Sequence, residues 1–182
     1  MLPAFFTCLP ASDMASVTVS LGQVAVPFVS QNYGAGNFER IKEIRLAMYG
    51  VAFVLSTVVA WSLMLFAEPL LSLFGIFSDG DSLSKMAYAS AITRMKYMFI
   101  PYCLLGFMEV GAGVVQGFKR ATLAAVTSLT GSCLLRVVWL LTVFKLNPTL
   151  ETVFITFPLS WFITAVAHFA VASVVIKKIK NQ

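Results

Sequence analysis

Apolar residues occur in long runs along this chain, and short charged or turn-forming segments separate the runs. A helix that crosses the hydrocarbon of a bilayer needs about 20 mostly apolar residues. The runs predict five transmembrane helices, over residues 10–31, 46–67, 97–118, 121–144 and 152–176. A stretch of mixed polarity at 82–96 has helical spacing and predicts an interfacial helix ahead of the third span.

Composition supports a lipid environment for most of the chain. Of its 182 residues, 59% are hydrophobic and 12% are charged, and the mean hydropathy is +0.87. Because about 25% of the residues of a soluble domain are charged, these charges are too few to coat a water-facing surface. The expected fold class is an all-α integral membrane protein that has membrane lipid as its surroundings.

The basic residues indicate an orientation in the membrane rather than a nucleic-acid partner. The net charge is +5, and Lys and Arg lie close to the ends of the apolar runs. Eight of them lie on one set of span ends: Arg40, Lys42, Arg45, Lys119, Arg120, Lys177, Lys178 and Lys180. Four lie on the other set: Lys85, Arg94, Lys96 and Lys145. Because Lys and Arg accumulate on the cytoplasmic side, we expect a multi-pass protein of the cell membrane, specifically a bacterial inner membrane, with a cytoplasmic C-terminus.

The sequence has no motif typical of catalysis or of a bound cofactor. It contains no phosphate loop, no cluster of metal ligands and no nucleophile–base pair, so neither an enzyme nor a cofactor is expected. Cys8, Cys103 and Cys133 lie in or beside apolar runs without a CxxC pattern, which favours small buried hydrophobic residues. The N-terminus has no basic region before its apolar residues, so a secretory signal is not predicted.

Polar residues inside a span are functional candidates by default, because burying them in hydrocarbon is costly. In the third span they share one helical face with small residues: Tyr102, Gly106, Glu109, Gly113 and Gln116. Two interpretations of Glu109 stay open. It belongs either to a packing seam, protonated or hydrogen-bonded, or to a water-filled cavity where it binds a proton, a cation or a cationic substrate.

Two basic residues lie inside the last two spans. Arg136 follows Ser128 and Ser132 at spacings of four residues, and we expect it to hold helices together. Glu109 differs from Arg136 by about 9 Å in depth, so a backbone carbonyl or a residue on another helix is an equal candidate for its partner. His168 is interpreted as a packing residue or, alternatively, as a proton relay.

The first span also carries a polar stripe that includes Gln23, consistent with a bent helix lining an interior path or with packing. The candidates for substrate or ion binding are therefore Glu109, Tyr102, Gln116, Gln23, Arg136 and His168.

The stretch QNYGAGN ends the first apolar run with two amides and two glycines. Glycine tolerates the left-handed backbone that a tight turn requires. We therefore expect Gln31, Asn32, Gly34 and Gly36 to form a structural turn that matters for folding rather than for substrate choice.

Three stretches together resemble the multidrug and toxic compound extrusion (MATE) family. They are PFVSQNYGAGNFERIKE, GFMEVGAGVVQGFKRA, and GSCLLRVVWLLTVF followed by FPLSWFITA. The resemblance runs in order along nearly the whole chain. It implies a fold of twelve helices in two lobes, of which residues 1–182 supply the last five, a C-terminal lobe without its first helix.

The resemblance also implies a function. The parent protein would export small organic, often cationic, compounds by secondary active antiport of protons or sodium ions. A fragment of this extent needs the missing N-terminal seven helices as its partner and is not expected to transport alone. Some family members carry an Asp in the third of these spans. Here Glu109, on a different turn, is the nearest carboxylate. The alternatives are a flippase for lipid-linked saccharides in the same superfamily and a non-transporting membrane scaffold.

Overall fold

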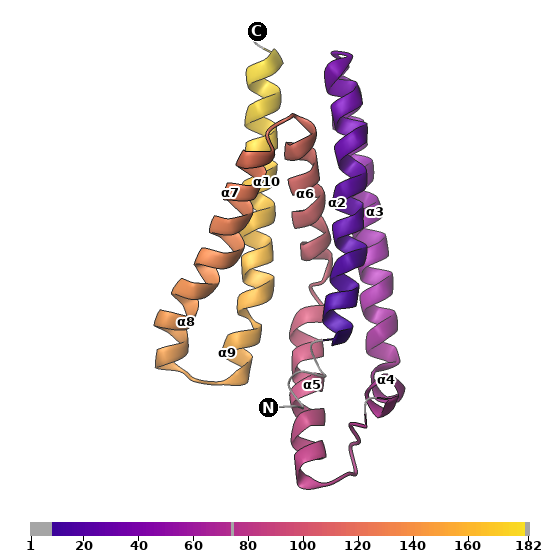
Figure 1. Cartoon of the computed structure of the whole chain (residues 1–182), viewed down its shortest axis with the longest axis vertical. Helices are drawn as coiled ribbons and strands as arrows, with labels where there is room; N and C mark the ends of the chain where they lie inside the picture. Colours follow the sequence, from indigo (N-terminus) through magenta and orange to yellow (C-terminus); the bar gives the residue numbers. More distant parts are fainter. Residues whose placement is uncertain (1–8, 74, 181–182) are drawn as a thin grey trace.

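The computed structural model describes the backbone of residues 9–73 and 75–180, with side chains over 16–73 and 75–178. Within these ranges the secondary structure is helical (Figure 1). The elements are α2 (Leu9–Gly34), α3 (Phe38–Leu65), α4 (Ala67–Leu73), α5 (Ser82–Phe99), α6 (Cys103–Gly117), α7 (Ala121–Ser128), η1 (Leu129–Leu134), α8 (Leu135–Leu146), α9 (Leu150–Phe154) and α10 (Thr156–Lys180). Cys8 lies outside the described residues.

Several of these helices are long and apolar enough to cross a membrane. Among the described residues, three continuous stretches qualify: Phe38–Leu65, Ala121–Leu146 and Leu150–Lys178. The pair α5 and α6 qualifies as a fourth if its two helices count as one span bent by 50°. The first expected span falls on α2, whose initial side chains lie outside the described part, so the count of five stays a prediction.

The break between α5 and α6 divides the expected third span. Pro101 lies in this break, where a proline ends the regular helical hydrogen bonding because its ring nitrogen has no hydrogen to donate. The helix expected over 82–96 extends to Phe99 and continues into α6 through the bend. Its position at the membrane interface stays a prediction.

Helix α6 lies at the centre of the bundle and packs against α2, α3, α7 and α10. Small residues make this possible, because they let helix backbones approach closely. A Cβ added at Gly113 would overlap the carbonyl of Gly22 on α2, and one added at Gly117 would lie 2.6 Å from the Cβ of Val29. On another side, a Cβ at Gly111 would lie 2.8 Å from the Cβ of His168 on α10.

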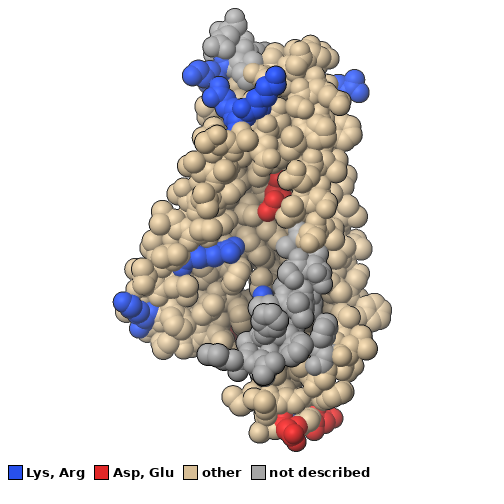
Figure 2. Space-filling model, in the orientation of Figure 1, with Lys and Arg blue, Asp and Glu red and all other residues tan. Residues whose placement is uncertain are grey.

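The chain connections gather at two opposite ends of the bundle. The α2–α3 turn, the α6–α7 link and the end of α10 lie at the upper end in Figure 1, and the α4–α5 and α8–α9 connections lie at the lower end. In Figure 2 a cluster of basic side chains lies at the upper end and acidic side chains lie at the lower end. The structure thus brings the three basic segments of the predicted cytoplasmic side together.

The QNYGAGN stretch ends α2 in a Schellman motif. The Asn37 N–H donates to the Asn32 carbonyl at 2.9 Å, and the Gly36 N–H donates to the Tyr33 carbonyl at 3.2 Å. Gly36 holds the left-handed position with φ of 72°, where glycine is usual. Gly34 is the last helical residue, has no positive φ and faces open space, so the turn geometry requires only the second glycine.

The structure differs from the expectation for the cysteines. Cys133 is exposed and Cys103 is partly buried. The reason at Cys133 is its position on η1, where the preceding residue, Ser132, points toward α10 and Cys133 turns away.

Gly36→Val should destabilise the protein while Gly34→Ala should not. A left-handed backbone costs a residue with a Cβ about 1–2 kcal/mol, and Gly34 has room for a methyl group. Thermal unfolding of the purified protein in detergent measures both. Equal losses in the two variants would contradict the assignment of the turn to Gly36.

Gly113→Val should lower the amount of folded protein, because the added side chain meets the α2 backbone. Overpacking of this kind costs typically about 1–3 kcal/mol. Gly50→Val is the matched control, since Gly50 lies on a helix with nothing within 4 Å of its added Cβ. Similar amounts of membrane-inserted protein for the two variants would show that α2 and α6 do not touch there.

Candidate functional site

A line of polar side chains joins the α7–η1–α8 stretch to α10, which runs antiparallel beside it (Figure 1). It has three cross-helix pairs, spaced four residues apart on each helix and therefore on one face of each. We call it the polar ladder, and its pairs are Ser128 with His168, Ser132 with Thr164, and Arg136 with Ser160. The distances are 3.3 Å from Ser128 Oγ to His168 Nε2, 3.4 Å between the Ser132 and Thr164 hydroxyls, and 3.0 Å from Arg136 Nε to Ser160 Oγ.

Arg136 is held by two residues of α10. Its Nε donates to Ser160 Oγ, and its guanidinium carbon lies 4.5 Å from the centroid of the Phe157 ring. In the described part of the chain the ion pair present is Lys42 with Glu39, so Arg136 does not pair with Glu109. Of the partners that the sequence left open, the structure selects a residue on another helix.

His168 is fully buried at the upper end of the polar ladder. Its Nε2 lies 3.4 Å from the Ala124 carbonyl oxygen, as well as near Ser128. A carbonyl oxygen only accepts hydrogen bonds, so the bond to Ala124 requires the proton on Nε2. The other ring nitrogen, Nδ1, is buried and has no hydrogen-bond partner among the described residues.

The middle pair of the polar ladder lies on a π-helical segment. This segment, η1, contains Ser132 and also Gly131, whose added Cβ would overlap the Thr164 side chain. Short π segments inside α-helices are rare and often lie at functional sites. The continuous apolar pattern over 121–144 gave no indication of it; the one local signal is a glycine between two hydroxyl residues, Thr130 and Ser132.

Glu109 lies half-buried on α6, on the side that contacts α2. A Cβ added at Gly22 would lie 2.7 Å from the Glu109 backbone oxygen and 3.4 Å from its Cβ. No side-chain hydrogen bond to the Glu109 carboxylate is present within the described residues. The carboxylate is therefore only half-buried, and no basic side chain among the described residues pairs with it.

Tyr102 lies near Glu109, at the start of α6. Its side chain is buried, and its ring meets that of Trp161 edge to face at 5.9 Å. Gln116 is half-buried farther along α6, and Gln23 is exposed on α2.

The six candidates thus fall into two groups. Arg136 and His168 belong to the polar ladder, whereas Glu109, Tyr102, Gln116 and Gln23 lie on α2 and α6. Among the described residues no group of three or more His, Cys, Asp or Glu side chains could hold a metal ion.

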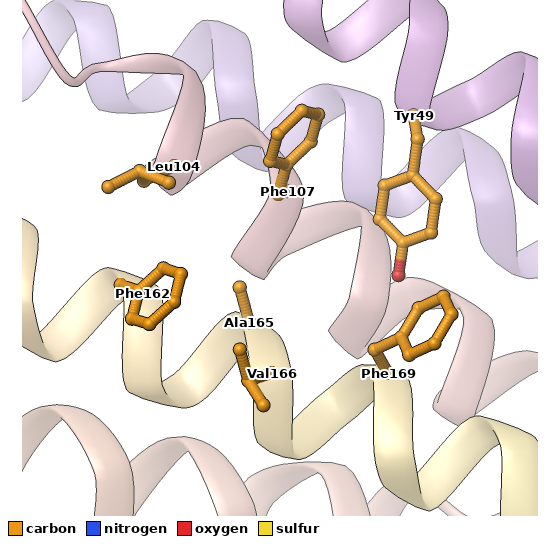
Figure 3. A pocket seen from close by; sticks show the side chains of 7 residues that line it. All are labelled: Tyr49, Leu104, Phe107, Phe162, Ala165, Val166 and Phe169. Carbon is orange, nitrogen blue, oxygen red and sulfur yellow. The ribbon is translucent and has the colours of Figure 1, made fainter.

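An apolar groove that the sequence did not indicate lies between α3, α6 and α10 (Figure 3). It has a volume of about 370 Å³. Its walls are Tyr49, Leu104, Phe107, Phe162, Ala165, Val166 and Phe169. The sequence interpretation treated the phenylalanines only as packing or lipid-facing groups.

Ser160→Ala should destabilise the bundle by about 0.5–2 kcal/mol, within the range measured for side-chain hydrogen bonds between membrane helices, because Arg136 loses its hydroxyl partner. Ser62→Ala is the control, since Ser62 is exposed and bonds to the carbonyl of Val58 in its own helix. Unfolding of each variant in detergent gives the difference. Equal stability of the two variants would mean that the Arg136–Ser160 bond contributes nothing.

Comparisons with known proteins agree with this architecture. The family model MatE matches residues 11–142. A solved structure described as "Crystal structure of MATE in complex with MaL6" superposes with a TM-score of 0.74 over 93% of this chain, at 18% identity, which shows a shared fold. The chain spans 39% of the length of that solved chain. Comparison with curated proteins gives no match. Because the family model covers well over half of the residues, the chain belongs to the MatE family.

Proposed function

We propose that this chain forms most of the C-terminal lobe of a secondary active exporter of small organic, often cationic, compounds, driven by protons or sodium ions. The observation that carries the proposal is Glu109, a half-buried carboxylate that has no side-chain hydrogen bond to the described residues, on the central helix of a MatE-family fold.

A carboxylate in this position has a limited set of stable states. An unpaired charge in hydrocarbon is costly, so Glu109 is stabilised when it carries a proton or faces a bound cation. If a proton or sodium ion and a cationic substrate compete for the same carboxylate, entry of one favours release of the other. That competition is sufficient for coupled exchange, provided that access to the site alternates between the two sides.

The surrounding residues support binding at this position. Tyr102 precedes Glu109 by seven residues, about two helical turns, and so lies on the same face. A hydroxyl can donate to a carboxylate or contribute an oxygen to an ion. Gln116 and Gln23 provide further polar groups on the same two helices. The break after α5 places Tyr102 at a helix start, where a small change in the bend moves its side chain relative to α2.

The polar ladder has a scaffold role in this proposal. Arg136 is engaged by Ser160 and Phe157, which disfavours a flippase that would need free cationic groups for a lipid-linked saccharide. Alternating access requires a second lobe, so the remaining helices of the parent transporter are the necessary partner of this chain.

Glu109→Gln in the parent transporter should insert normally and lose most ion-driven export, because an amide keeps the shape but cannot titrate. Coupling between two binding events is typically worth about 1–3 kcal/mol, or about 5–150-fold, and the loss should fall in that range. Glu109→Asp should retain part of the activity. Export is measured in vesicles with an imposed pH or sodium gradient.

Glu43→Gln is the control for the Glu109 experiment, since Glu43 is an exposed acid near the start of α3. Full transport by Glu109→Gln under both gradients would leave this residue as part of a packing seam and would favour the scaffold interpretation.

The grouping of basic segments at one end of the bundle supports a cytoplasmic C-terminus. Alkaline phosphatase fused after Gln182 should therefore be inactive, whereas a fluorescent protein at the same position should fluoresce. The reverse pair of results would place the basic end outside the cell.

A further inference from the structure

The apolar groove between α3, α6 and α10 has a shape and composition suited to a hydrocarbon chain. Three of its wall residues are about half exposed: Phe162 at 53%, Val166 at 53% and Phe169 at 49%. Figure 3 shows these side chains and Phe107 bordering one open space. From Phe162 to Phe169 the groove follows α10 for about 10 Å, at about 1.5 Å per residue.

Arg45 lies at one end of this groove. It is one helical turn before Tyr49 on α3, and its guanidinium carbon lies 4.8 Å from the centroid of the Phe169 ring. Its Nη1 is 3.5 Å from Ser173 Oγ, one turn beyond Phe169 on α10. Tyr49 and Phe169 are wall residues of the groove, so the guanidinium of Arg45 lies directly beside its apolar surface.

No acidic side chain among the described residues pairs with Arg45. Among the described residues, Glu39 pairs with Lys42, and Glu43 is only two residues before Arg45 on α3, hence on another face of that helix. Lys177 is exposed one turn after Ser173 on α10 and adds positive charge at the same end. Within the described residues, the Arg45 guanidinium therefore lies at one end of the apolar groove, with a hydroxyl and an aromatic ring as neighbours but without an acid.

We propose that this groove binds an anionic phospholipid, with an acyl chain along Phe107, Phe162 and Val166 and the phosphate on Arg45. A guanidinium matches a phosphate with two parallel hydrogen bonds, and Arg is suited to this geometry more than Lys. The arrangement places apolar and anionic parts of one molecule against matching parts of the protein.

The same features disfavour other occupants. A cationic transport substrate would be repelled by Arg45 and Lys177. An apolar helix, from a second copy or from the remaining helices of the parent transporter, would fill the groove but would leave the guanidinium without an anion. The site is separate from Glu109, and the inference does not rest on the proposed transport function.

The test uses the purified protein and two lipid probes, phosphatidylglycerol and phosphatidylcholine, each titrated in mixed micelles. Native mass spectrometry counts the lipids retained, and thermal unfolding confirms that each variant is folded. The wild-type protein should retain phosphatidylglycerol more strongly. Arg45→Gln should weaken that retention about fivefold, the effect of about 1 kcal/mol expected for one basic residue at a lipid surface.

Two matched pairs of variants separate the parts of the site. Arg40→Gln removes the same charge at the same end of α3 but on another face, and it should leave the lipid preference unchanged. Val166→Trp fills the groove and should lower retention of phosphatidylglycerol. Val137→Trp, an equally exposed valine on α8, should not.

Several outcomes would overturn the proposal. Equal retention of the two lipids by the wild type, or equal effects of Arg40→Gln and Arg45→Gln, would exclude a specific anion site. Normal retention by a folded Val166→Trp variant, or full competition by glycerol phosphate, would mean that only the headgroup binds. Displacement of the lipid by an organic cation would make the groove a substrate site. Cross-linking of two copies of a Phe162→Cys variant that lipid does not affect would make it a dimer interface.

Discussion

Direct backbone contact between α2 and α6, where Gly22 meets Gly113, is the constraint on which the rest of the bundle depends. Helices in lipid gain little from the hydrophobic effect when they associate, so close van der Waals contact between small residues has to hold them. With α6 fixed against α2 on one side, Gly111 lets α10 approach on another. The position of Glu109 follows from this contact, since its own backbone forms part of the α2–α6 surface.

Much of the fold could be predicted because hydrophobic length and turn chemistry are local properties of the sequence. The apolar runs located the long helices, and the two glycines after Asn32 located the end of α2. The break at Pro101 was not predicted, because the apolar run continues through it and length alone favours one unbroken span. Gly34 was assigned the same role as Gly36, because a sequence shows where glycines occur but not which of them has positive φ.

The sequence predicted candidate residues on single helices but not how these residues pair across helices. Spacings of four residues placed Ser132 and Arg136 on one face of one helix, and His168 was a candidate on another, yet nothing local specifies how two helices rotate against each other. The pairing of these faces is a tertiary property, as is the choice of Ser160 over Glu109 as the partner of Arg136. The apolar groove was missed for the same reason, since its walls come from three helices far apart in the sequence.

The π segment η1 determines how the two faces of the polar ladder stay aligned. In a regular α-helix, each step of four residues overshoots a full turn by about 40°, so a row of side chains at that spacing winds gradually around the helix. The wider turn of a π segment takes up part of this overshoot. Removal of one residue from η1 would restore regular winding and rotate everything that follows by about 100°. The guanidinium of Arg136 would then point away from α10, although no residue of the ladder had been changed. One extra residue in the middle of a helix thus determines the direction in which every side chain of its C-terminal half points.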